Sequence, residues 1–184
     1  MKFYLYADET IWTSPAGFLI VAVVALPGDQ VEYIRSLVTR LEVASGRDKR
    51  KWAQSLTAKK IAFLDGLGPI LDGSPPILWR HHPGTNVDQV RLTALVVAGA
   101  AHQVDPLGAF YVMIDGFKKA EGHLVSGAMK SRGLAFKKIV GGRDESEPLL
   151  RLADALAGFL GDRAKGKPYT IEAWRRVGHL FQEV

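Results

Sequence analysis

The chain of 184 residues contains no cysteine. This excludes disulfides, thiolate zinc sites and cysteine nucleophiles. It also has no apolar run of membrane-spanning length, because residues 17–26 provide only about half of what a bilayer requires. A phosphate-binding loop of the Walker type is absent, so nucleotide hydrolysis by that route is not supported. No signal peptide precedes the first predicted strand, and we therefore expect a cytoplasmic protein.

Acidic residues are scarce in two basic segments of a chain whose net charge is +5. Residues 47–60 contain one acid, Asp48, and residues 118–143 contain one, Glu121, while more than half of the 24 lysines and arginines lie in these two segments. Such a distribution suits a polyanionic partner, but lysine is also the ordinary residue of a solvated surface. Both interpretations stay open. The candidates for phosphate contacts are Lys49, Lys51, Lys118, Lys137 and Lys138.

Two short hydrophobic runs lead directly into aspartates. Residues 2–7 favour a buried strand and are followed by Asp8 and Glu9, and residues 109–114 lead into Asp115. Ligands and catalytic groups gather at the carboxyl ends of strands in sheets that helices cover. We therefore expect strand ends at these acids, with Asp8 and Glu9 pointing to opposite faces. Aspartate is also a common turn residue, which is the simpler explanation of each acid alone.

A third acid lies on a helix that is apolar on almost every side. Residues 149–160 predict a largely buried helix, and Asp154 lies within it. A buried carboxylate costs free energy unless a cation or hydrogen bonds compensate it. Helix capping explains Asp144 and Glu147 before this helix, but it does not explain Asp154.

The order of predicted elements indicates one domain with a mixed α/β sheet. The first two strands form an antiparallel hairpin, and helices flank the sheet. The predicted strands are residues 2–7, 17–26, 77–82, 109–115 and 134–140, with a partial strand at 47–52. The predicted helices are residues 30–44, 57–71, 87–104, 119–130, 149–160 and 171–182.

If the two aspartate-ending strands are adjacent, then Asp8, Asp115 and Asp154 can meet at one point. Such a cluster repels itself unless cations neutralise it, and hard oxygen ligands favour Mg²⁺ or Mn²⁺. Two such ions about 4 Å apart can clamp the attacking and leaving oxygens of a phosphodiester displacement. A basic groove beside them would bind the backbone of a nucleic acid.

Three motifs follow one another along the chain. They are Tyr-Ala-Asp-Glu-Thr at residues 6–10, Val-Met-Ile-Asp at 112–115, and Arg-Leu-Ala-Asp followed by small and apolar residues at 151–158. With these motifs the chain resembles, over nearly its whole length, the family catalogued as domain of unknown function 3800. That family typically has Ser-Gly where this chain has Thr10 and Ile11, and glutamine where it has Arg151.

The resemblance implies a ribonuclease H-like fold and a divalent-metal-dependent nuclease that hydrolyses phosphodiester bonds of nucleic acid. Asp8, Asp115 and Asp154 would be metal ligands, with Mg²⁺ or Mn²⁺ as the cofactor. Glu9 would be a support or a fourth ligand.

Other interpretations remain. A catalytically inactive module that binds nucleic acid or protein could keep this fold, with Arg151 neutralising Asp154 in place of a metal. A phosphatase that uses Asp8 as its nucleophile usually needs a second aspartate where this chain has Thr10, which disfavours that reading. The pair His81 and His82 could bind metal or phosphate, but we favour the polar end of a strand.

Overall fold

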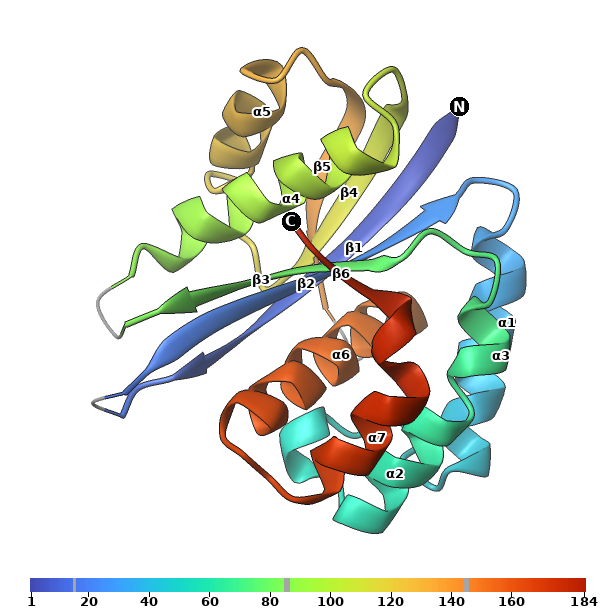
Figure 1. Ribbon diagram of the computed structural model, residues 1–184. Coiled ribbons are helices and arrows are strands. Elements are labelled where there is room, and N and C mark those ends of the chain that lie inside the picture. Colours follow the sequence, from blue (N-terminus) through green and yellow to red (C-terminus); the bar gives the residue numbers. More distant parts are fainter. Residues whose placement is uncertain (15, 85–86, 144–145) are drawn as a thin grey trace.

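The sheet lies at the centre of the computed structural model, which describes residues 1–14, 16–84, 87–143 and 146–184. Six strands in these ranges have the order β5-β4-β1-β2-β3-β6 (Figure 1). The strands are β1 (Lys2–Trp12), β2 (Phe18–Pro27), β3 (Ile77–Pro83), β4 (Ala109–Asp115), β5 (Ala135–Gly142) and β6 (Phe181–Glu183). The helices are α1 (Val31–Ala44), α2 (Thr57–Asp65), α3 (Gly68–Leu71), α4 (Gln89–Val104), α5 (Gly122–Lys130), α6 (Pro148–Ala164) and α7 (Tyr169–Val177).

Strand β1 is central and has neighbours of both directions. It pairs in parallel with β4 up to Ala7 and Ile114, and antiparallel with β2 as far as Trp12 and Phe18. The predicted hairpin is therefore confirmed. The remainder of the sheet adds β5 in parallel beside β4, β3 antiparallel beside β2, and β6 in parallel beside β3.

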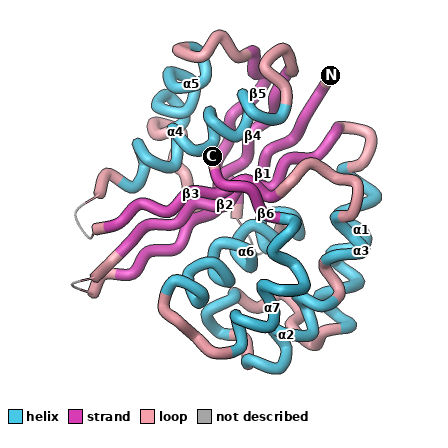
Figure 2. Tube along the Cα trace, viewed as in Figure 1, coloured by secondary structure: helices cyan, strands magenta, loops and turns pink. Residues whose placement is uncertain are grey.

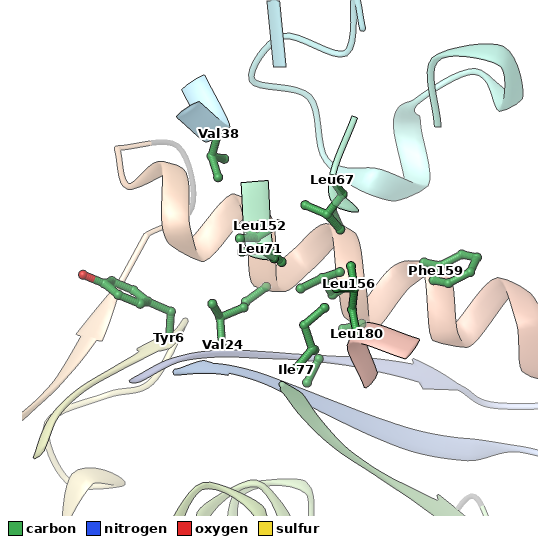
Figure 3. Close-up of a cluster of buried hydrophobic side chains, with 14 of the residues drawn as sticks. Tyr6, Val24, Val38, Leu67, Leu71, Ile77, Leu152, Leu156, Phe159 and Leu180 are labelled. Carbon is green, nitrogen blue, oxygen red and sulfur yellow. The ribbon is translucent and has the colours of Figure 1, made fainter. Parts of the chain in front are cut away.

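Helices cover both faces of the sheet, as Figures 1 and 2 show. On one face α4 and α5 pack against alternate side chains of β1, among them Leu5 and Ala7. On the other face α6 packs with α1, α2, α3 and α7 over a larger hydrophobic cluster (Figure 3). Tyr6 points into this second cluster, because successive side chains of a strand alternate between the two faces. Within the described ranges, no helix is both long and apolar enough to cross a membrane.

Several predicted boundaries are wrong. Strand β1 does not end at Asp8 but continues to Trp12, because β2 goes on pairing with it after β4 has turned away. The helix predicted over 57–71 is broken into α2 and α3. The helix predicted over 171–182 ends at Val177, and the chain then adds the short strand β6. The basic segment 47–52 is not a strand and leads into a 3-10 turn at Trp52–Gln54.

Helix α6 approaches its neighbours closely through small residues. A Cβ atom added to Gly161 would lie 2.8 Å from Cγ2 of Thr10 on β1. A Cβ atom added to Gly158 would lie 2.3 Å from Cδ1 of Trp52. The helix is thus fixed between the sheet and the segment that carries Trp52. Its N-cap is Glu147, as predicted, with the side chain accepting from the backbone N–H of Leu149, while Asp144 lies outside the described residues.

We expect Gly158→Ala to destabilise the fold by about 1–3 kcal/mol, because the new methyl group overlaps the base of a fixed indole. Gly127→Ala is the matched control, since nothing lies within 4 Å of its added Cβ on helix α5. That control should be neutral or gain up to about 1 kcal/mol from helix propensity. Urea denaturation measures both, and equal stabilities of the two variants would contradict the close contact.

Candidate carboxylate site

Asp8 and Asp115 lie side by side where two parallel strands separate. The β1–β4 ladder ends at Ala7 and Ile114, so each aspartate is the next residue on its strand. Neighbouring strands are about 5 Å apart at such a point. Gly116 follows with a φ of 66°, which lets β4 leave the sheet at once. The predicted convergence of these two acids is therefore present, although β1 itself continues.

Asp8 is a buried carboxylate with little compensation. It is 8% exposed, and its Oδ1 accepts a hydrogen bond of 2.7 Å from the backbone N–H of Glu9. Burial raises the pKa of Asp8 well above its ordinary range, and the negative charges of Glu9, Asp154 and Asp115 raise it further. Among the described residues, no lysine or arginine forms an ion pair with Asp8. Ionising Asp8 therefore lowers the stability of the folded protein.

Asp154 lies on helix α6, and identified hydrogen-bond donors compensate its negative charge. Its Oδ2 accepts from Nη2 of Arg47 at 3.0 Å and from the backbone N–H of Trp52 at 2.8 Å. One guanidinium that contacts Asp154 is that of Arg47, which is fully buried. Arg151 binds both carboxylate oxygens of Glu42 at 2.8 Å. Neutralisation of Asp154 by Arg151 stays a prediction, whereas its ion pair with Arg47 was not expected.

The buried arginine belongs to a larger ion network. Nη1 of Arg47 lies 3.7 Å from Oε1 of Glu42, which also binds Arg151. Burial lowers the pKa of Arg47, while the charges of Asp154 and Glu42 oppose that change. The network joins α1, the segment after it and α6, and it holds Asp154 in one orientation.

Glu9 lies on the opposite face of β1, as the alternation of a strand predicts. Its Oε1 accepts a hydrogen bond from Gln89 at the start of α4. Its Oε2 is buried without a hydrogen-bond partner in the part of the chain that the structure describes. Burial raises the pKa of Glu9, and the charges of Asp115 and Glu121 add to it, while the hydrogen bond from Gln89 lowers it. Glu9 is thus coupled to Asp115 but does not share a face with Asp8.

These carboxylates form an electrostatically coupled group rather than a closed ligand shell. Over residues 1–14, 16–84, 87–143 and 146–184, no three histidine or acidic side chains are arranged so that they could hold one metal ion. His81 and His82 lie near the C-terminal end of strand β3, as predicted. Burial lowers the pKa of His82, with the charges of Arg80 and His81 acting in the same direction.

The first basic segment divides into a buried part and an exposed part. Lys49 and Lys51 are exposed, close along the chain to the Trp52 N–H that binds Asp154. Arg47 and Lys60 are buried and paired with acids, so they are not available to phosphate. In the second segment all three candidates are exposed: Lys118 three residues after Asp115, and Lys137 and Lys138 on β5.

Asp162 is a structural carboxylate that the sequence interpretation missed. Its Oδ2 accepts from the indole N–H of Trp52 at 3.1 Å, from Lys60 at 2.9 Å and from the hydroxyl of Tyr169 at 2.6 Å. Lys167 lies 2.8 Å from its Oδ1. Burial raises the pKa of Asp162, but hydrogen bonds from Lys167, Tyr169 and Lys60 outweigh it, and the net change is downward. These contacts fix Trp52, whose backbone in turn fixes Asp154.

Comparison with known proteins gives matches among solved structures. A chain of the PCNA:RNase HII complex from Archaeoglobus fulgidus matches with a TM-score of 0.55 and 15% identity, over 95% of this chain and 88% of that chain. Ribonuclease H2 from Pyrococcus horikoshii OT3 matches with a TM-score of 0.58 and 16% identity, over 96% and 89%. The chain has a ribonuclease H-like fold. No protein-family profile and no curated protein matches it significantly.

We expect Asp8→Asn to stabilise the metal-free protein at pH 7. Because the pKa of Asp8 is raised by folding, the native protein loses stability as the pH rises through that raised value, and the amide variant does not lose this part. The difference should vanish at low pH, where Asp8 is protonated in both states. Urea denaturation in EDTA across this pH range measures it, with the exposed Asp72→Asn as a charge-matched control. A stability loss for Asp8→Asn at pH 7 would contradict the uncompensated charge.

Proposed function

We propose that the chain is a divalent-metal-dependent nuclease in which Asp8, Asp115 and Asp154 hold the metal. The observation that carries this proposal is the buried Asp8, which lies in the field of the other two acids and pairs with no cation among the described residues. Burying a carboxylate without a cation costs free energy of folding, so a metal ion bound at Asp8 would stabilise the folded protein. A fold that retains such a destabilising residue usually does so for function. The fold shared with the structures of ribonuclease HII and ribonuclease H2 supports the same proposal.

The donor set fits a hard cation. Asp8, Asp115 and Asp154 offer carboxylate oxygens alone, which suit Mg²⁺ or Mn²⁺. A bound ion would polarise the phosphodiester and offset the repulsion that raises the pKa of Asp8. The chain's own part is orientation: two acids stand on adjacent strands, and Arg47 and the Trp52 N–H fix the third. Glu9, on the other face, acts as a supporting residue coupled to Asp115.

Exposed lysines would hold the nucleic-acid backbone. Lys118 follows the end of β4 closely, and Lys138 pairs in register with Tyr111 of the same strand. These positions place cations on the β4–β5 half of the sheet, with Lys138 in register four residues before Asp115. The remaining candidates are Lys137 on β5, and Lys49 and Lys51 before Trp52. Membership in the domain of unknown function 3800 family is part of this proposal and rests on the three motifs described above.

One observation favours a second candidate, a nucleic-acid- or protein-binding module without catalysis. Arg47 already neutralises Asp154, and no three acids in the described ranges are arranged around one ion. Such a module would keep the basic surface and would not depend on divalent ions. Metal dependence therefore separates the two candidates.

The deciding experiment compares cleavage by the native protein with that by Asp8→Asn and Asp115→Asn. The substrates are single-stranded RNA, single-stranded DNA, duplex DNA and an RNA–DNA hybrid, each with Mg²⁺, Mn²⁺ or EDTA. We expect each variant to lose about 100-fold or more of the activity, because the metal contributes several kcal/mol of transition-state stabilisation. Asp72→Asn, an exposed acid elsewhere, should keep full activity.

Asp154 is a poorer first choice for this experiment. Its removal leaves Arg47 buried without that partner, which destabilises the fold by about 3 kcal/mol and confounds an activity measurement. Full cleavage by Asp8→Asn, or cleavage that persists in EDTA, would contradict the nuclease proposal. Nucleic-acid binding in EDTA without cleavage under any condition would establish the binding module instead.

A further inference from the structure

A second feature lies away from the carboxylates, at the hairpin end of the sheet. A hollow of about 450 Å³ opens between the ends of β1, β2 and β3, the C-terminal part of α6, and α7. Its lining includes Trp12, Trp79 and Trp174, which are three of the chain's four tryptophans, together with Phe18 and His81. The three indoles are half-buried, but Trp174 is stacked on Phe159 and covered by Arg163, so Trp12 and Trp79 present the ring surface to a ligand.

Two cations lie over these rings. The guanidinium carbon of Arg163 is 4.3 Å from the centre of the Trp174 ring, and Nζ of Lys165 is 5.7 Å from that of Trp12. Both side chains are exposed, and neither forms an ion pair with an acid in the portion of the chain that is described. The described residues that line the hollow include no acid. By contrast, the nearby Lys167 is paired with Asp162.

The hollow is separate from the carboxylates but not remote from them. Asp8 and Trp12 are four residues apart on one face of β1, which corresponds to about 13 Å. Between them Gly161 of α6 covers Thr10. Asp154 and Arg163 are nine residues apart on α6, or two and a half turns, so they lie on opposite sides of that helix. The hollow is thus an additional surface across α6 from the acids.

We propose that this hollow binds a single-stranded segment of nucleic acid, with bases stacked on the indole rings of Trp12 and Trp79 and phosphates held by Arg163 and Lys165. Stacked aromatic side chains beside cations are the general means of holding single strands without sequence preference. An apolar peptide, or a second copy of the chain that docked the same hollow against this one, would bury these two cations without acids to pair them, at a cost in free energy. A nucleic-acid strand offers bases that stack on the tryptophans and phosphates that pair with the two cations.

The inference rests on the proposed function only in taking nucleic acid as the ligand. Stacked nucleotides advance about 3.4 Å each, so the straight distance from Trp12 to Asp8 equals about four of them, and a strand that passes around α6 needs more. A strand whose cleavage site lies at the carboxylates would thus extend around α6 into the hollow. Short oligonucleotides would reach one surface and not the other.

Tryptophan fluorescence gives a direct readout. The fourth indole, Trp52, is 2% exposed, so quenching by a ligand reports on the hollow. The probe is oligothymidylate of about twelve nucleotides, titrated in EDTA so that no cleavage occurs. We expect saturable quenching for the native protein, and binding about 5- to 100-fold weaker for Trp79→Leu. Arg163→Gln should weaken binding several-fold and reduce the dependence of log K on log salt by about 0.7.

Arg40→Gln is the matched control, because Arg40 is also an exposed arginine without an ion pair among the described residues. Urea denaturation checks that each variant folds. Equal affinity of Arg163→Gln and Arg40→Gln would overturn the proposal. Self-association that Trp79→Leu abolishes, without any change in oligonucleotide affinity, would also overturn it and assign the hollow to a second copy of the chain.

The two proposals fail separately. Quenching that Arg163→Gln weakens, in a protein that never cleaves, would support the hollow and reject the nuclease. Cleavage that depends on Asp115, in a protein whose tryptophans do not respond to the oligonucleotide, would support the nuclease and reject the hollow.

Discussion

The close contact between helix α6 and strand β1 is the constraint on which the site depends. Gly161 meets Thr10 without room for a methyl group, and Gly158 meets Trp52 in the same way. Larger residues at either position would lift the helix and withdraw Asp154 from the two strand aspartates. The same contact leaves an opening on the other side of α6, where Leu160 and the exposed Arg163 border the aromatic hollow. The placement of α6 against β1 thus defines both the carboxylate site and the aromatic hollow.

Ion pairs with buried arginines explain why helix α6 tolerates Asp154. The buried Glu42 and the half-buried Asp154 pair with two buried arginines, Arg47 and Arg151, so in these contacts two negative charges face two positive ones. Such networks contribute little net stability, because desolvation offsets attraction, but breaking one is costly. Asp8 has no such balance within the described ranges. The fold therefore compensates one carboxylate internally and leaves another strained, which is the pattern expected where function opposes stability.

The sequence predicted the sheet, the hairpin and the adjacency of Asp8 and Asp115, because hydrophobic runs that end on acids are local signals. That Asp154 joins these two around one ion stays a prediction, since no three acids are so arranged in the described ranges. It could not show that Arg47 is buried, since one acid that pairs with Arg47, Asp154, lies 107 residues away and the run around Arg47 has the composition of a surface. The three-residue strand β6 was missed because it is too short to show a period. The end of β1 was misplaced because pairing with β2, rather than the acids, decides where that strand stops. The tryptophans of the hollow are far apart in sequence and gave no signal before the fold was known.

The central claim is that the coupled carboxylates are a divalent-metal site. Anomalous diffraction from crystals soaked in Mn²⁺ tests it most directly, with the native protein and Asp115→Asn, each with and without a cleavage-resistant oligonucleotide. We expect a manganese peak between Asp8 and Asp115 in the native protein that is lost in the variant. If the native crystals show no peak at these carboxylates even with the oligonucleotide bound, the claim is wrong, and the raised pKa of Asp8 needs another explanation.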